Sequence, residues 1–519
     1  MSSRIKNTLL NILTSLGGQL LATILKFVTR TVLIHTLGKA YLGINGLFSD
    51  ILTMLSLTEL GLDTAINFKM YKPLAEKDAQ RVRVLLIFYK QAYRIIGIII
   101  LLLGLCLIPA LPYLIKDYGS LNALGIDAVL IFVLYLLQSV SSYLFFAYKS
   151  SVMKANQKSY ILNSAEYAIT VFACIVKIVI LKLTKNFVAY TAVSILFVIL
   201  QNYVNAIISQ RYFPEFFIPE TSRLSKKEVI GLLKDCGSLF LYKTNVVVVK
   251  ATDNLVLSSF LSLTAVGLYS NYLLLYNTMQ QMLGKLYAAA KASMGNLFAT
   301  ESIETRYQFF RVMNFITILL YGTAGVGISV CSDELIRVWI SAEYVIPQPL
   351  AILVGLEMIL VGLGNNLGQI RNVSGVFRQM WYRPLIGIIL NIVVSVALVQ
   401  QWGINGVVAG TICTLLFTNI AIDPWLIYRY SFNNYRSAKE YYSKNLAYGF
   451  VLMLIFAGDA WLCNHFFVGQ GWWSVALHVL VVLITVPGIM LLIFGKTDEG
   501  RYLMRLINRI LSRTIIKQD

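Results

Sequence analysis

The chain has 519 residues, of which 57% are hydrophobic and 13% are charged, and its formal net charge is +19. Its mean hydropathy is +0.70. An average soluble domain carries about 25% charged residues, so this chain has too few to cover a soluble surface. The same apolar content excludes a disordered chain. The positive charge alone would suggest a nucleic-acid partner, but the apolar composition predicts an all-α polytopic membrane protein with no such partner.

A helix needs about 20 apolar residues to cross the hydrocarbon core of a bilayer. The apolar run that ends near Leu37 is too long for a signal peptide and is followed by no small-residue cleavage site, which indicates an uncleaved first span. In chain order, hydropathy predicts about fourteen transmembrane helices, at 13–36, 43–68, 92–115, 126–147, 160–181, 187–209, 238–261, 264–288, 312–332, 347–369, 384–400, 404–428, 445–465 and 471–494.

Lys and Arg gather in alternate connecting segments, and the remaining connections carry few of them. Because positively charged loops stay on the cytoplasmic side of a membrane, this asymmetry predicts cytoplasmic N- and C-termini, as an even number of spans requires. The tail at 495–519 repeats a basic residue every four positions with apolar residues between. This pattern is typical of an amphipathic helix that contacts anionic membrane lipids, and the repeated residues are Arg501, Arg505, Arg509 and Arg513.

The sequence contains a weak internal repeat. Two pairs of segments are similar at nearly the same offset, and the first pair aligns Gly43 with Gly267: 31–48 with 254–272, and 149–160 with 371–382. The repeat predicts two parallel six-helix lobes and a further helix pair, which would place a substrate path between the lobes near the membrane midplane. The predicted parts are an N-terminal lobe at 1–220, a C-terminal lobe at 221–444, the helix pair at 445–494 and the tail at 495–519.

Segment 211–237 joins the two predicted lobes. Ser225 and Glu228 have the spacing of a capping box, in which each side chain accepts a hydrogen bond from the backbone N–H of the other residue at the start of a helix. An apolar face follows them, which predicts an amphipathic linker helix on the inner side.

Basic residues inside predicted spans are the most informative charges. The first helix carries Lys26 and Arg30, the seventh carries Lys243 and Lys250, and these two helices contain one acid, Asp253. The repeat maps Lys26 onto Lys250. Ionisable groups at this depth usually face a cavity or the protein interior. One interpretation is buried ion pairs that lock helices together; the excess of cations favours the other, a cavity that binds an anion such as a substrate phosphate.

Polar residues on neighbouring helices complete the predicted cavity. The eighth helix presents Tyr269, Tyr276 and Gln280 on one face, suited to contacting sugars. Four acids in spans are candidates to carry a coupling proton or sodium ion: Glu59, Asp63, Asp253 and Glu357. The cysteines and histidines are scattered singly, so no metal, disulfide framework or cofactor is expected.

Three stretches carry a family resemblance. YLGINGLFSDILTMLSLTELGLDTAINFKMY (41–71) and DNLVLSSFLSLTAVGLYSNYLLL (253–275) resemble helices of Wzx-type oligosaccharide flippases, of the polysaccharide transporter family in the MATE-like (MOP exporter) superfamily. The strongest similarity is the basic loop, YRP entry and Gly-rich turn of RNVSGVFRQMWYRPLIGIILNIVVSVALVQQWGINGVVAGT (371–411). The resemblance covers most of the first twelve predicted helices and rests on order and spacing together.

This resemblance implies a MATE-like fold in a bacterial cytoplasmic membrane and transport of polyprenyl-diphosphate-linked oligosaccharide repeat units from the inner to the outer leaflet by alternating access. Lys26, Arg30 and Lys250 match the family's cationic cavity by type and depth, whereas Asn254, at the symmetry mate of Arg30, departs from a symmetric clamp. Polysaccharide polymerase machinery is an implied partner. The extra pair at 445–494 resembles helices that form a lipid-tail groove in related lipid II flippases.

Two alternatives remain open. A multidrug exporter on the same fold would need an anionic cavity for cationic drugs, and the excess of cations argues against it. A membrane polymerase or ligase needs a substantial outer loop with catalytic residues. The longest predicted outer loop, near 333–346, is short and holds no constellation of His with acidic residues. The sequence therefore favours a transporter that is not an enzyme.

Overall fold

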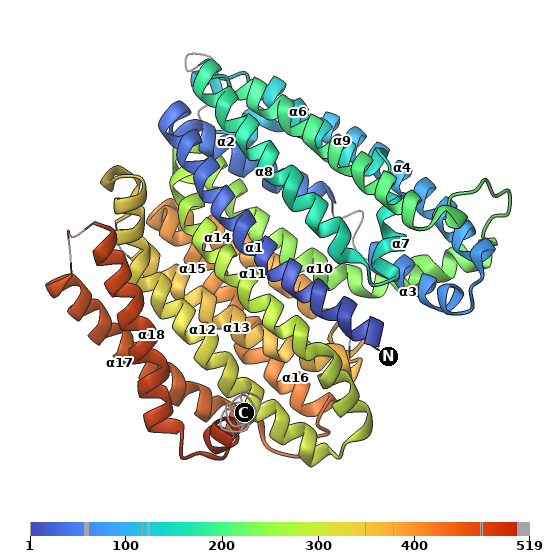
Figure 1. Ribbon diagram of the computed structural model, residues 1–519. Coiled ribbons are helices and arrows are strands. Elements are labelled where there is room, and N and C mark those ends of the chain that lie inside the picture. Colours follow the sequence, from blue (N-terminus) through green and yellow to red (C-terminus); the bar gives the residue numbers. More distant parts are fainter. Residues whose placement is uncertain are drawn as a thin grey trace, which may run out of the picture. The chain divides into compact units, whose positions relative to one another are not determined.

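The computed structural model describes residues 2–505 apart from gaps at 57–61, 117, 122–124, 348, 377, 468 and 470. The described part is helical, with no β-strand, and it forms two compact units, Met1–Gly267 (unit 1) and Leu268–Asp519 (unit 2) (Figure 1). The prediction of an all-α polytopic protein is confirmed. The predicted lobe boundary near residue 220 follows the sequence repeat and stays a prediction, since the compact unit 1 continues to Gly267.

Unit 1 is a bundle in which α1 packs on α8, α8 on α9, α9 on α6, and α6 on α4 (Figure 1). A second contact joins α10 to α2. Its helices are α1 (Ser2–Leu37), α2 (Lys39–Leu55), α3 (Leu62–Ala75), α4 (Ala79–Leu107), α5 (Leu111–Leu114), α6 (Ala128–Leu144), α7 (Ser150–Ala155), α8 (Ser159–Thr184), α9 (Phe187–Tyr212) and α10 (Lys226–Phe260), followed by the first turn of α11 (Leu263–Thr300).

Two glycines allow the starts of α2 and α11 to touch. A Cβ added to Gly43 would lie 1.9 Å from the carbonyl oxygen of Leu263, and one added to Gly267 would lie 2.4 Å from that of Lys39. No other residue type fits at such distances from backbone atoms. The contact is reciprocal, and its two glycines are those that the sequence repeat aligned.

α10 begins as the sequence predicted. Ser225 caps the helix and Glu228 returns the hydrogen bond, so the capping box is confirmed. The predicted linker helix and the predicted seventh span form one continuous helix, because no Pro or helix-ending Gly separates them. Arg81, at the start of α4, pairs with Glu228 and ties this helix end to unit 1.

Unit 2 is built around α12, which packs on α13, α17 and α18. Apolar residues of α12, α17 and α18 share one buried core. The helices are α12 (Ile303–Trp339), α13 (Leu350–Ser374), α14 (Arg383–Trp402), α15 (Ile404–Leu415), the π-helical turn η9 (Leu416–Ile422), α16 (Asp423–Tyr430), α17 (Ala438–Phe466) and α18 (Trp472–Phe494). The predicted outer loop at 333–346 is shorter than expected because α12 continues to Trp339.

Ten helices of the described part are long and apolar enough to cross a membrane, or eleven if the bent pair of α6 and residues 147–155 is one span. The predicted spans missing from this set are 43–68, 238–261 and 264–288. The polar residues that the sequence placed in the cavity lower the hydropathy of α10 and α11, and the chain between α2 and α3 includes the gap at 57–61. In the tail, residues 498–505 are helical, and Arg509 and Arg513 lie outside the described residues.

Candidate functional site

The first polar cluster joins α2 to α10 inside unit 1. Asn254 is 3% exposed, and its side-chain amide donates to Oδ2 of Asp50. Lys250, one helical turn earlier, lies close enough to Asp50 to interact with it electrostatically. Asp253 is 5% exposed in the same turn. A carboxylate removed from water needs such partners, and α10 supplies them to Asp50.

This arrangement corrects one expectation from the sequence. The count of acids near the seventh helix included Asp253 and omitted Asp50, because Asp50 comes from the preceding repeat segment. The packing of α2 against α10 supplies it. Helical spacing explains why Lys250 and Asn254 both lie near Asp50, since residues four apart share a face of a helix.

The two cations of α1 lie in a different environment. α1 packs mainly on α8. Arg30 lies within electrostatic range of Tyr190 on α9, and Nζ of Lys177 lies 5.3 Å from the centre of the same ring. The side chain of Lys26 is exposed and makes no hydrogen bond or ion pair with any described residue. Among the residues that the structure describes, Lys26 therefore has no counter-charge, and it lies in a helix apolar enough to span a membrane.

The second polar cluster lies in unit 2 and contains three of the predicted residues. Tyr276 hydrogen-bonds to Glu357 of α13. Gln280 donates to the Tyr276 hydroxyl at 3.3 Å and accepts from the Tyr321 hydroxyl at 3.5 Å. Asn365 then donates to Tyr321 at 3.0 Å. The result is a hydrogen-bonded chain from α11 through α12 and α13, and the sequence had placed two of its members, Tyr276 and Gln280, on one face of the eighth span.

The predicted aromatic platforms are closed in this structure. Tyr269 is 0% exposed and Tyr276 is 1% exposed. Stacking of either ring on a sugar would require the helices around it to open. Three predicted residues, Glu59, Asp63 and Lys243, have side chains outside the described part of the chain.

A buried ion pair in unit 2 was missed by the sequence analysis. Arg383, which had been counted with the inner loop, is 9% exposed and binds Asp423 in a bidentate manner, with Nε–Oδ1 and Nη2–Oδ2 both at 3.0 Å. It also donates to Asn419 in η9. The available signal was Asp423, an acid inside the apolar run at 404–428 with no partner assigned to it.

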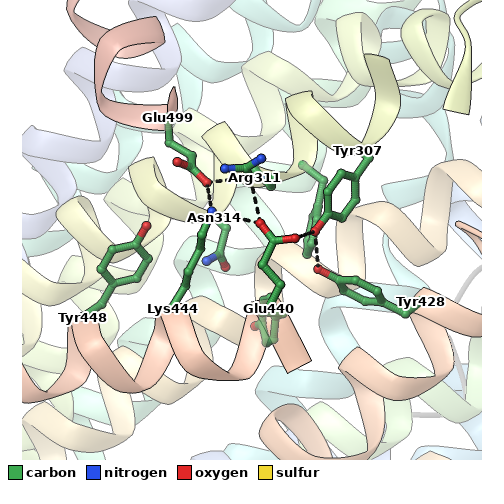
Figure 2. Close-up of a pocket in the computed structure, with 10 residues that line it drawn as sticks. Tyr307, Arg311, Asn314, Tyr428, Glu440, Lys444, Tyr448 and Glu499 are labelled. Carbon is green, nitrogen blue, oxygen red and sulfur yellow. Dashed lines mark hydrogen bonds and ion pairs between the residues drawn. The ribbon is translucent and has the colours of Figure 1, made fainter. Parts of the chain in front are cut away.

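The cavity in Figure 2 is lined by charged and aromatic residues of unit 2 but has room for little beyond one water, at ≈ 10 Å³. Glu499 accepts from Arg311 at 2.6 Å and from Lys444 at 2.5 Å. Glu440 pairs with the same two cations and accepts from Tyr307. Burial would raise the pKa of Glu499, but the hydrogen bonds from Arg311 and Lys444 outweigh it and lower the pKa to about 2. This cluster fastens the start of the tail to α12 and α17.

No family model and no curated protein matches the sequence. Solved structures match the fold. The lipid II flippase MurJ, in an inward closed conformation, aligns with a TM-score of 0.59 at 14% identity, over 94% of this chain and 99% of that chain. A mutant of the MATE transporter VcmN from Vibrio cholerae aligns with a TM-score of 0.56 at 13% identity, over 82% and 97%. An outward-facing multidrug resistance MATE family transporter of the MOP superfamily aligns with a TM-score of 0.54 at 13% identity, over 82% and 96%.

These alignments and the apolar helices identify a multi-pass membrane protein with a fold like that of the MATE transporters and MurJ, as predicted. MurJ covers a larger share of this chain than the two MATE transporters do. At these identities the alignments concern the fold, and the transported substrate has to be argued from this chain's own residues.

Proposed function

We propose that the protein is a flippase of the bacterial cytoplasmic membrane, with both termini in the cytoplasm. It moves polyprenyl-diphosphate-linked oligosaccharide repeat units from the inner to the outer leaflet by alternating access and supplies polysaccharide synthesis. The observation that carries this proposal is the uncompensated cation on α1: Lys26 has no ion-pair partner among the described residues. A diphosphate is the kind of ligand that such a group binds.

Other features agree with an anionic substrate. Arg30 and Lys177, both cations, lie near the same ring, that of Tyr190. The fold is shared with the lipid II flippase MurJ. The multidrug exporter remains the second candidate because MATE transporters also share the fold. A raised drug tolerance in an overexpressing strain, with normal polysaccharide export after deletion, would favour it. A polymerase would instead lengthen polymer in a purified system.

The test is a deletion strain complemented with wild type or with the double variant Lys26→Gln/Lys250→Gln. Loss of two charge-assisted contacts to a diphosphate should lower export more than about tenfold, with lipid-linked repeat units accumulating inside the cell. Lys182→Gln is the matched control, because it neutralises an exposed lysine in the last turn of α8. Normal export by the double variant at normal membrane abundance would refute the proposal.

Glu357 is the best-supported candidate for ion coupling, because the hydrogen-bonded chain through Tyr276 and Gln280 ends on its carboxylate. Asp253, another predicted candidate, lies in unit 1 and is 5% exposed. We expect Glu357→Gln to preserve the hydrogen bond with Tyr276 and to remove the dependence of transport on a proton or sodium gradient. The measurement is flux into vesicles under imposed gradients, and a variant with unchanged gradient dependence would exclude Glu357 from coupling.

A further inference from the structure

A cationic cavity lies in unit 1, and the residues that line it are far in sequence from Lys26. Its volume is ≈ 270 Å³, and it lies between α4, the turn before α7, the end of α9 and the segment 213–220. All of these segments belong to connections that the distribution of Lys and Arg assigns to the cytoplasmic side. The cavity has room for several waters, at about 30 Å³ each, which is enough for a phosphate group and its neighbouring atoms.

A break in the helix shapes this cavity. α6 ends at Leu144, and the chain turns by 41° before it resumes at 147–155. Phe146 adopts φ of 59°, which non-glycine residues rarely do. The turn brings Tyr148 and Lys149 to the cavity wall opposite α4. Backbone strain of this kind persists where the surroundings hold it, often at binding sites.

Two lysines face the cavity without a counter-charge among the described residues. Lys90 and Lys149 are half-buried and lie close enough to repel one another. Nζ of Lys90 lies 6.0 Å from the ring centre of Tyr148, and Nζ of Lys149 lies 5.6 Å from that of Phe217. Among the described residues, neither lysine has an acidic group within ion-pair distance.

The remaining charged groups of the cavity are already paired. Arg83 bonds to Glu220 at 3.3 Å and to the carbonyl oxygen of Glu215 at 3.1 Å. The other carboxylate oxygen of Glu220 accepts from the backbone of Thr221 and Ser222. Arg83 and Glu220 therefore neutralise each other, and the net charge of the cavity comes from Lys90 and Lys149.

Apolar residues form the rest of the wall and the rim. Leu86, Ile87 and Phe216 line the cavity. Ile218, also on the wall, is 57% exposed, and Phe146 near Lys149 is 40% exposed. An anion dissolved in water would gain nothing from such a rim, whereas a lipid presents its glycerol and acyl groups beside its phosphate.

We propose that this cavity binds the headgroup of an anionic phospholipid. Lys90 and Lys149 contact the phosphate, and Ile218 with its apolar neighbours contacts the adjoining hydrocarbon. The inference does not depend on the transported substrate, because it uses no residue of the Lys26 or Lys250 clusters.

The experiment titrates phosphatidylglycerol into the purified full-length protein in phosphatidylcholine nanodiscs and counts retained lipids by native mass spectrometry. Wild type should retain one phosphatidylglycerol in preference to phosphatidylcholine. Lys90→Gln/Lys149→Gln should weaken this retention by about tenfold or more, since two charge-assisted hydrogen bonds are lost. Lys182→Gln should bind as wild type does. If the double variant fails to fold, Lys90→Gln and Lys149→Gln are titrated singly, with thermal unfolding measured in parallel to show that each is folded.

A second arm separates lipid from free phosphate. Ile218→Ser keeps both lysines and should weaken phosphatidylglycerol retention several-fold without changing the effect of added inorganic phosphate. Equal retention by the lysine variants and wild type, or no preference over phosphatidylcholine, would overturn the proposal. Displacement of the lipid by millimolar inorganic phosphate, with Ile218→Ser unaltered, would assign the cavity to a soluble anion and would overturn it too.

Discussion

At the residue scale, two glycines, which have no Cβ, decide how closely α2 and α11 approach each other. Gly43 faces the carbonyl of Leu263, and Gly267 faces the carbonyl of Lys39. Neighbouring Gly46 is looser, with the nearest atom, in the Val266 side chain, at 3.4 Å. The same two positions are aligned by the sequence repeat, so these two glycines meet a packing requirement.

We expect Gly43→Ala and Gly267→Ala each to destabilise the protein by about 1–3 kcal/mol, because an added methyl group would have to displace backbone atoms. Gly46→Ala is the matched control and should be nearly neutral, since a flexible side chain can move. Thermal unfolding in detergent measures the difference. Equal unfolding temperatures for Gly43→Ala and Gly46→Ala would contradict the close approach seen here.

At the element scale, the π-helical turn η9 lies where Arg383 meets Asp423. The turn interrupts the run from α15 to α16 and carries Asn419, which accepts from Arg383 and donates to the carbonyl of Leu360 on α13. An extra residue in a helical turn re-aims the side chains beyond it. The ion pair and the turn therefore hold α13, α14 and α16 together.

Removing one partner of this pair should be costly. Arg383→Ala leaves the Asp423 carboxylate buried with a weaker set of partners, and we expect a loss of about 3–5 kcal/mol. The double variant Arg383→Met/Asp423→Leu should recover much of this loss, because it leaves no buried charge. A double-mutant cycle on unfolding free energy tests both statements, and additive losses would show that the two side chains do not interact.

At the scale of the whole molecule, ion pairs tie together segments far apart in the chain. In unit 1, Arg81 and Arg83 hold the segment before α10. In unit 2, Arg311, Lys444 and Glu499 fasten the start of the tail (Figure 2). Such contacts join segments near the ends of the helices.

The Glu499 contact has a predictable pH dependence. Its pKa is about 2 in the folded protein against an ordinary value of 4.5, so the unfolded state binds more protons between these values. The stabilisation, at most about 3 kcal/mol, is fully present above pH 4.5 and is lost as the pH falls towards 2.

Unfolding temperature followed against pH checks this. Glu499→Gln should lower stability at neutral pH and flatten the curve between pH 4.5 and 2. Asp498→Asn is the control, because Asp498 is 78% exposed and lies 3.6 Å from the same arginine. A Glu499→Gln curve parallel to wild type would refute the assignment.

The family resemblance of the sequence implied the MATE-like fold. Composition and spacing by themselves determined the membrane class, most of the helices and the capping box at Ser225. These follow from local composition and spacing, which the bilayer constrains strongly because every backbone polar group in it must be satisfied within a helix. The sequence also placed Tyr276 and Gln280 on one face, since helical periodicity is local.

Only the tertiary structure decided which charges meet. Asp50 joins Asn254, Arg383 joins Asp423, and Lys90 faces Lys149, in each case across helices that lie far apart in the chain. Side-chain pairing depends on which helices pack together and how they are rotated, and hydropathy carries no information on either. For that reason the sequence could count the intramembrane cations, and only the structure could show that Lys250 lies near Asp50 whereas Lys26 has no acidic partner among the described residues.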